Sequence, residues 1–403
     1  MIDDLLGVAA CSDDSVALNS IINVKIESKK LRLSEKKCFK IHVSKSLNSC
    51  HRKLKAHGNM IDEVQSASYL GDVINSECTI DDTIKLRRNK SIGVKNQFSV
   101  ILNSVSFGFY YAEIAFILRE ALFINGILTN SEVWYGTKKK HITALEAADA
   151  DLMRMILGAH PKTAIELLYL ESGRLPLEHV MAKRRFMFLW TILKRNKDDL
   201  TRKVYEIQKV KKTTGDWYLF IQDEKMKYRI NLQDDEIERM SKYKFKTVVC
   251  KKVEEYAFQE LKEKASKHSK STGVLQLMEK SKGLRKQSYL SGEEFTKDDI
   301  KLLFKLRTRM IDVKTNFPSS YGNDLMCRMC EEPTSVENED HLLQCKLLLP
   351  DQQKNDVKFM GVFGPYYYSL LLFIKTLNNN SLFSNREYVK IYCKYHVNNQ
   401  NWL

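Results

Sequence analysis

From residue 76 onward, hydrophobic positions recur with a helical period over long stretches of the chain. Apolar residues are spaced three or four apart near 109–123, at 142–156 and again after Pro176, which predicts three amphipathic helices. Thr79 and Asp82 have the spacing of a capping box for a fourth, earlier helix, and Gly158 is a typical helix stop. Residues 76–195 are therefore expected to form a helical bundle.

The pattern differs on either side of this bundle. Residues 15–27 are periodic enough for one helix, residues 38–43 alternate like a strand, and residues 68–75 predict a short strand or turn. Residues 196–240 are polar and weakly periodic, which indicates a linker with some local helix. Thr296 and Asp299 predict the start of another helix, whose apolar stripe leads into a cysteine-rich segment.

The predicted fold class is mainly α. The expected segments are a small N-terminal α/β region (1–75), a helical bundle (76–195), a linker and basic helical segment (196–315), a cysteine–histidine segment (316–350) and a C-terminal tail (351–403). The most apolar stretch, about 101–128, contains Glu113, Arg119 and Glu120, which favours a buried helix over a membrane span.

Charge adds a candidate partner. The chain has 65 Lys and Arg against 50 Asp and Glu, a net charge of +15, and such a balance favours polyanions such as nucleic acid. Residues 242–286 hold thirteen Lys and Arg against five Glu, with Tyr243, Phe245, Tyr256 and Phe258 among them. Basic segments of this kind can follow a phosphate backbone and stack bases. The alternative is a solvated helix face whose aromatic residues turn into a core, and we favour it for the aromatics.

Cys327, Cys330, His341 and Cys345 are spaced C-x2-C-x10-H-x3-C within MCRMCEEPTSVENEDHLLQC. Thiolates and an imidazole at this spacing are typical of a tetrahedral Zn²⁺ site with no open coordination position, so the ion is expected to be structural. The alternative is three reduced cysteines and a histidine that fall close together by chance. The other six cysteines have no framework spacing, and Asp3 and Asp4 stand where a signal peptide would be basic. We therefore expect an intracellular protein, nuclear or cytoplasmic and not secreted.

The order of several motifs resembles the C-terminal half of a reverse transcriptase from non-long-terminal-repeat (LINE-type) retrotransposons. MIDDLLGV is similar to the palm motif with two aspartates, SYLGDVI to the end of the palm, and LLYLESGRLPLEHVMAKRR to the thumb region. LFKLRTRM followed by the Cys-Cys-His-Cys pattern is similar to the C-terminal zinc knuckle.

The resemblance implies a palm remnant, a thumb-like bundle and a zinc knuckle that bind RNA or an RNA–DNA hybrid. Asp3 and Asp4 would be Mg²⁺ ligands in a complete parent enzyme, and they are expected to be idle here because a further palm Asp and the fingers are missing. We expect a truncated copy that has no polymerase activity by itself. We also expect that it neither associates with a membrane nor acts on a small-molecule substrate. The residues expected to contact nucleic acid are Lys85, Arg87, Arg88, Lys183, Arg184, Arg185, Lys262, Lys264, Lys267 and Lys270.

Two other hypotheses stay open. In the first, the chain is an unrelated zinc-stabilised helical protein that binds another protein, and the aspartate pair is accidental. In the second, the chain is part of an active polymerase, which would require the missing part in trans.

Overall fold

A computed structural model of the 403-residue chain gives its architecture. The structure describes residues 6–8, 12–30, 38–42, 53–56, 59–104, 110–134, 136–279, 281, 283–291, 295–311, 313–328, 330, 332–338, 341 and 345. The predicted Mg²⁺ ligands Asp3 and Asp4 and the predicted tail, 351–403, lie outside these residues.

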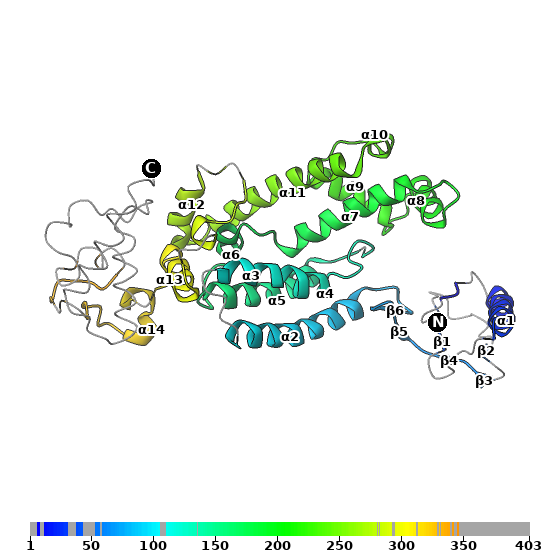
Figure 1. Cartoon of the computed structure of the whole chain (residues 1–403), viewed down its shortest axis with the longest axis horizontal. Coiled ribbons are helices and arrows are strands. Elements are labelled where there is room, and N and C mark those ends of the chain that lie inside the picture. Colours follow the sequence, from blue (N-terminus) through cyan, green and yellow to red (C-terminus); the bar gives the residue numbers. More distant parts are fainter. Residues whose placement is uncertain are drawn as a thin grey trace.

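The described part of the chain is mainly helical, as predicted, and it is elongated (Figure 1). The α-helices are α1 (Ser12–Ser28), α2 (Asp81–Ser104), α3 (Tyr111–Leu118), α4 (Asn125–Ile127), α5 (Lys139–Leu157), α6 (Ile165–Ser172), α7 (Leu177–Lys194), α8 (Leu200–Lys211), α9 (Trp217–Lys227), α10 (Asp234–Arg239), α11 (Lys242–Ala265), α12 (Thr272–Glu279), α13 (Lys297–Arg307) and α14 (Pro318–Tyr321). A π-helix, η3 (Arg119–Ile124), joins α3 to α4, and the 3-10 helices are η4 (Ser269–Ser271), η5 (Ser288–Leu290) and η6 (Lys314–Asn316).

The strands that the structure describes lie before α2 and form three separate two-stranded pairs. They are β1 (Phe39–Lys40), β2 (Lys55–Ala56), β3 (Asn59–Met60), β4 (Asp62–Glu63), β5 (Ser66–Tyr69) and β6 (Asp72–Asn75). β5 and β6 form an antiparallel hairpin in which Tyr69 faces Asp72 across a turn of Leu70 and Gly71, both at positive φ. β1 pairs with β4 in parallel and β2 with β3 antiparallel. The strand predicted from residue 38 is therefore shorter than expected. The short strand or turn predicted over residues 68–75 is confirmed, because these residues form the end of β5, the turn and β6.

Several local signals are confirmed. Gly158 adopts the left-handed conformation directly after α5, and Thr296 and Asp299 form the predicted capping box of α13. Thr79 does not begin its helix in the predicted way. α2 starts at Asp81, and Asn75 donates its side-chain amide to both Thr79 and Asp82.

The helices enclose two hydrophobic cores. The larger core gathers buried residues of α2, α3, α5 and α6 with those of α12 and α13, and Phe116, Leu152 and Phe304 are fully buried in it. The second core lies between α7, α9 and the first half of α11, around Phe186, Ile221 and Phe245. Apolar burial of this extent is the main force that holds such a body together.

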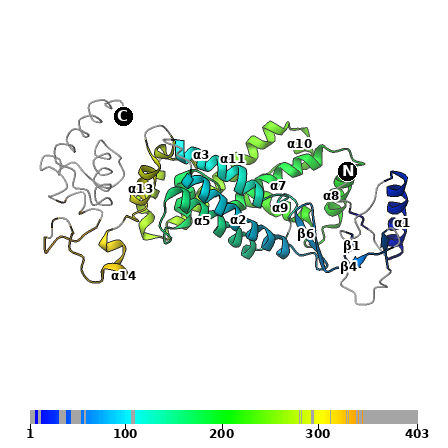
Figure 2. The ribbon, with the colours of Figure 1, turned by 60° about the horizontal axis from the view of Figure 1, so that its bottom comes forward.

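Helices α7 and α11 belong to both cores. On α11, Phe245, Val249 and Val253 enter the second core, whereas Phe258 and Leu261 enter the first. α11 lies along α7 and α6 (Figures 1 and 2). The boundary predicted at residue 195 therefore does not separate two bodies, because segments from both sides of it share each core. Phe245 and Phe258, predicted to turn inward, are buried, while Tyr243 is exposed.

The prediction of a linker over residues 196–240 is wrong. This stretch forms α8, α9 and α10, which pack against α7. Tyr205, Ile221 and Ile237 are buried in the second core, and the Asp199 side chain caps α8 through the backbone amide of Thr201 at 2.9 Å. Frequent charged residues hide the few apolar positions that anchor these helices.

A buried ion pair fixes α13, and with it the start of the cysteine-rich segment, to the body. Arg307 on α13 donates to both carboxylate oxygens of Glu171 on α6, at 2.6 and 2.9 Å. Tyr289 donates its hydroxyl to the same carboxylate at 2.9 Å. Two motifs that carry the resemblance, LLYLESGRLPLEHVMAKRR and LFKLRTRM, therefore meet in space at a buried charge pair.

Among the described residues, no helix combines the length and apolar character needed to cross a bilayer. The apolar stretch near 101–128 is α3, η3 and α4 in its described part from residue 110, with Phe116, Phe123 and Ile124 buried in the larger core.

Candidate metal centre and nucleic-acid interface

The structure brings the four predicted metal ligands together. One donor atom each from Cys327, Cys330, His341 and Cys345 lies within 4.8 Å of the others, and Cys327 and Cys345 are buried. Cys330 Sγ lies 3.5 Å from His341 Nε2. Three thiols and an imidazole so gathered can hold a metal ion.

These distances can be compared with the edges of a tetrahedral zinc site. With Zn–S near 2.3 Å and Zn–N near 2.0 Å, the edges of the tetrahedron are roughly 3.5–3.8 Å long. The Cys330–His341 separation of 3.5 Å already has this value, and the largest separation of 4.8 Å is about one ångström longer than such an edge.

Backbone pairing around a tight turn brings the first two cysteines to the site. Met326 and Val336 form an antiparallel bridge, and the Cys327 amide donates to the Ser335 carbonyl at 2.9 Å. The Ser335 hydroxyl lies 3.1 Å from Cys330 Sγ. Residues 342–344, which separate His341 from Cys345, lie outside the described part of the chain.

Glu337 organises the turn, a role that no motif in the sequence indicated. Its side chain is 2 % exposed and accepts from the backbone amides of Lys314 and Arg328 and from the Arg328 guanidinium. Its own amide donates to the Leu325 carbonyl. Burial opposes the charge of Glu337, but the Arg328 hydrogen bonds outweigh it and lower the pKa of this carboxyl. The carboxylate thus links the turn to η6 beside the body.

Two further groups prepare the site. The pKa of the Cys330 thiol is lowered to about 6, mainly by a hydrogen bond with the Ser335 hydroxyl and next by one with the Glu332 backbone. The lower pKa favours the thiolate that binds metals. The Asn338 side chain accepts from the His341 amide at 2.7 Å and so fixes the backbone that carries the imidazole. Both contacts link residues only three to five apart, yet no ligand-spacing rule would have identified them.

Two of the ten residues predicted to contact nucleic acid are wrongly assigned, because their side chains are buried in ion pairs. Arg87, 2 % exposed, bonds to Asp72 at 2.7 Å and to two backbone carbonyls, so it joins the β5–β6 hairpin to the helices. Arg185, 1 % exposed, donates to Glu224 of α9 at 2.8 Å. Neither guanidinium is accessible to a phosphate.

The other predicted contacts are at least partly accessible. Lys85 and Arg88 are exposed one turn apart on α2. Those on or after α11 are partly engaged: Lys262 lies over the Phe258 ring, Lys264 and Lys267 pair with Glu260 and Glu263, and Lys270 donates to Asn316.

Lys183 and Arg184 lie on a cleft between α7 and α11, described further below. Arg174 and Lys246 line the same cleft and were not predicted. Arg174 precedes α7 by a few residues, whereas Lys246 is far from residues 183–184 in sequence and reaches the cleft because α11 packs against α7.

No family model, curated protein or solved structure matches the chain.

Proposed function

We propose that the chain is a zinc-stabilised, nucleic-acid-binding portion of a LINE-type reverse transcriptase. The observation that carries this proposal is the convergence of Cys327, Cys330, His341 and Cys345 within 4.8 Å. Their donor set is the one expected of structural zinc. They follow the helical body in the chain order that the resemblance requires.

The charge of the chain supports the choice of partner. A net charge of +15, with Lys85 and Arg88 exposed side by side on α2, favours a phosphate backbone. In this proposal RNA or an RNA–DNA hybrid is bound through phosphate contacts with little preference for sequence. Polymerase activity is not part of the function that we propose for this chain alone.

Binding curves at several salt concentrations test the proposal. Fluorescence anisotropy with a labelled single-stranded RNA, an RNA–DNA hybrid and a DNA duplex should show affinity falling steeply between ~50 and ~200 mM salt. Lys85→Gln with Arg88→Gln should weaken binding, whereas Lys203→Gln with Lys211→Gln on α8, the same loss of charge, should have a smaller effect. Affinity that does not respond to salt would contradict the proposal.

Primer extension tests the absence of catalysis. With Mg²⁺ and all nucleotides, the purified chain should not extend a primer annealed to an RNA template. Extension by the native chain that is abolished by Asp3→Ala would overturn this expectation and assign the aspartate pair a catalytic role.

A second candidate function, protein binding, is favoured by one specific observation. Helix α8 presents four apolar side chains to solvent on one face: Leu200, Val204, Ile207 and Val210. Its buried side chains, Arg202 and Tyr205, lie on the opposite face. Photo-crosslinking from position 207 in cells, with Leu200→Gln and Val210→Gln as the control, tests this alternative. A crosslinked protein that disappears in the double variant would support it.

A further inference from the structure

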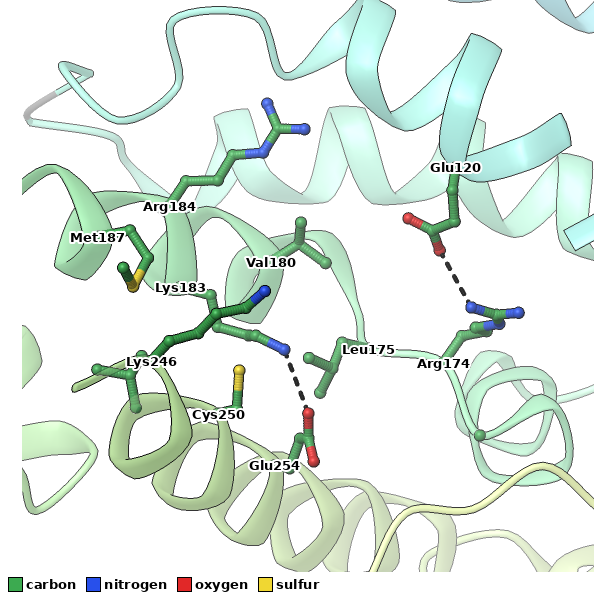
Figure 3. Close-up of a pocket in the computed structure, with 12 residues that line it drawn as sticks. Glu120, Arg174, Leu175, Val180, Lys183, Arg184, Met187, Lys246, Cys250 and Glu254 are labelled. Carbon is green, nitrogen blue, oxygen red and sulfur yellow. Dashed lines mark hydrogen bonds and ion pairs between the residues drawn. The ribbon is translucent and has the colours of Figure 1, made fainter. Parts of the chain in front are cut away.

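A cleft of about 560 Å³ opens between α7 and α11 (Figure 3). Its volume is in the range of natural ligand sites. Apolar side chains of Leu175, Val180 and Val249 form part of its wall. Four cationic side chains from three separate segments line it as well: Arg174, Lys183, Arg184 and Lys246.

Two carboxylates are among the described residues that line the cleft, and both already have partners. Glu254 accepts from Lys183 at 3.2 Å. Glu120 is shared between Arg119 at 2.9 Å and Arg174 at the longer distance of 3.7 Å. The dashed lines in Figure 3 mark the Lys183–Glu254 and Arg174–Glu120 pairs.

Among the described residues, neither of the other two cations forms an ion pair with a carboxylate. Arg184 donates to neutral acceptors, the Leu128 carbonyl at 2.6 Å and Asn125 Oδ1 at 2.7 Å. Lys246 is exposed and has no ion-pair partner in the described part of the chain. The cleft therefore has an excess of positive charge beside an apolar wall.

Desolvation makes this excess unfavourable in the free protein. Burial lowers the pKa of Arg174 and of Arg184, and nearby glutamates oppose the effect only in part. An anion in the cleft would restore the interactions that these guanidinium groups lose with water. Guanidinium groups are well suited to phosphate because their planar N–H donors match its oxygens.

We propose that this cleft binds the phosphodiester backbone of a single-stranded nucleic acid, an inference that rests on the proposed function. No aromatic ring is among the described residues that line the cleft, so in this assignment bases are not stacked there and binding does not depend on their identity. A phosphate group contacts Lys246, while the apolar wall accommodates the sugar.

The first test removes one charge from the cleft. Lys246→Gln changes an exposed side chain and leaves the described ion pairs intact, so folding should be unaffected. We expect roughly three- to tenfold weaker binding of single-stranded RNA and a salt dependence shallower by about one phosphate contact. Lys251→Gln, an exposed lysine on the same helix outside the cleft, is the matched control and should retain native affinity.

The second test uses a thiol in the cleft as a reporter. Cys250 lines the cleft beside Lys183, whereas Cys78 is exposed on a remote part of the chain. Alkylation of the zinc-loaded protein, followed by peptide mass spectrometry, should show Cys250 protected by bound RNA and Cys78 reacting at its free rate. Inorganic phosphate and pyrophosphate form a second arm that separates a free phosphate from a nucleic-acid strand.

The outcomes separate this inference from the proposed function. Salt-dependent RNA binding without Cys250 protection, and with native affinity in Lys246→Gln, would overturn the cleft assignment and leave the proposed function standing. Protection of Cys250 by pyrophosphate, without RNA binding, would overturn both the nucleic-acid function and the phosphodiester as ligand. Protection by RNA that is lost in Lys246→Gln and retained in Lys251→Gln supports the inference.

Discussion

The helical body and the cysteine–histidine segment are stabilised by different means. From α2 to Val313, aliphatic and aromatic side chains fill two cores, and buried arginine–carboxylate pairs join distant helices. Among the described residues after Val313, the buried ones are Lys314, Cys327, Ser335, Glu337 and Cys345. None of these is aliphatic or aromatic, so hydrophobic burial contributes little there. A segment of this size needs another source of stability, and a metal ion bound by the four ligands would supply one.

Metal removal should therefore have the largest effect and should be confined to one region. We expect one zinc per native chain and none in Cys327→Ser, because apparent binding energies of ~10–16 kcal/mol are coupled to folding in small zinc domains. Elemental analysis measures the metal. Hydrogen exchange should show residues 314–338 losing protection while α5 and α7 keep theirs.

Cys78→Ser provides the control for this experiment, because Cys78 is exposed and distant from the four ligands. A native chain without zinc, or unchanged exchange in residues 314–338 after metal loss, would remove the contrast between the two regions.

The next largest effect is expected within the body, at the buried pair of Glu171 and Arg307. Glu171→Gln leaves the Arg307 guanidinium buried without its counter-charge, which should lower the free energy of unfolding by about 3–5 kcal/mol. Urea denaturation of the zinc-loaded protein measures the change. Glu263→Gln removes the exposed partner of Lys267, 4.0 Å away, and should cost at most ~1 kcal/mol. Equal effects in the two variants would show that the buried pair is not special.

A glycine beside this pair tests how tightly the body is packed. Gly173 has a φ of +65°, and a Cβ there would overlap the backbone nitrogen of Lys286. Gly173→Ala should destabilise by about 3 kcal/mol, from backbone strain and overpacking together. Gly136 has a φ of +64° with open space around it, so Gly136→Ala reports the strain alone, about 1 kcal/mol. A similar loss in both variants, measured by urea unfolding, would indicate that residues 285–286 move aside.

The smallest expected effect depends on pH. Burial, aided by the nearby charges of Glu178 and Asp149 and opposed by Lys264, raises the pKa of Glu146 from 4.5 to about 7. Since the folded pKa is the higher one, the folded state favours the protonated form. The stabilisation is full below pH 4.5 and is lost as the pH rises through 7.

Relative to the native chain, Glu146→Gln should therefore be more stable at pH 8 than at pH 4 by about 2–3 kcal/mol. Thermal or urea unfolding across this range measures the gap between the variant and the native chain. A gap that stays constant with pH, as expected for Glu263→Gln, would show that Glu146 ionises freely in the folded protein.

The sequence predicted those features that depend on neighbouring residues. Gly158 and the Thr296–Asp299 pair mark helix ends through contacts within one turn. The four metal ligands also converge through a spacing visible in the sequence. Local chemistry was enough for each of these predictions.

Features that depend on distant partners were missed. Arg87 and Arg185 look like surface cations until Asp72 and Glu224 pack against them, and these acids are 15 and 39 residues away. Trp217 and Ile221 sit among charged residues, so α9 looked like a linker although both side chains enter the second core. The cleft likewise requires α11 to lie against α7, which no local pattern reveals.

Helix α11 has a consequence for how the molecule comes apart. At 24 residues it is about 36 Å long, and its two halves supply side chains to different cores. Loss of either core would expose half of a continuous helix and weaken the other, because the same backbone carries both. Despite its divided interior, the body should therefore melt in a single cooperative transition.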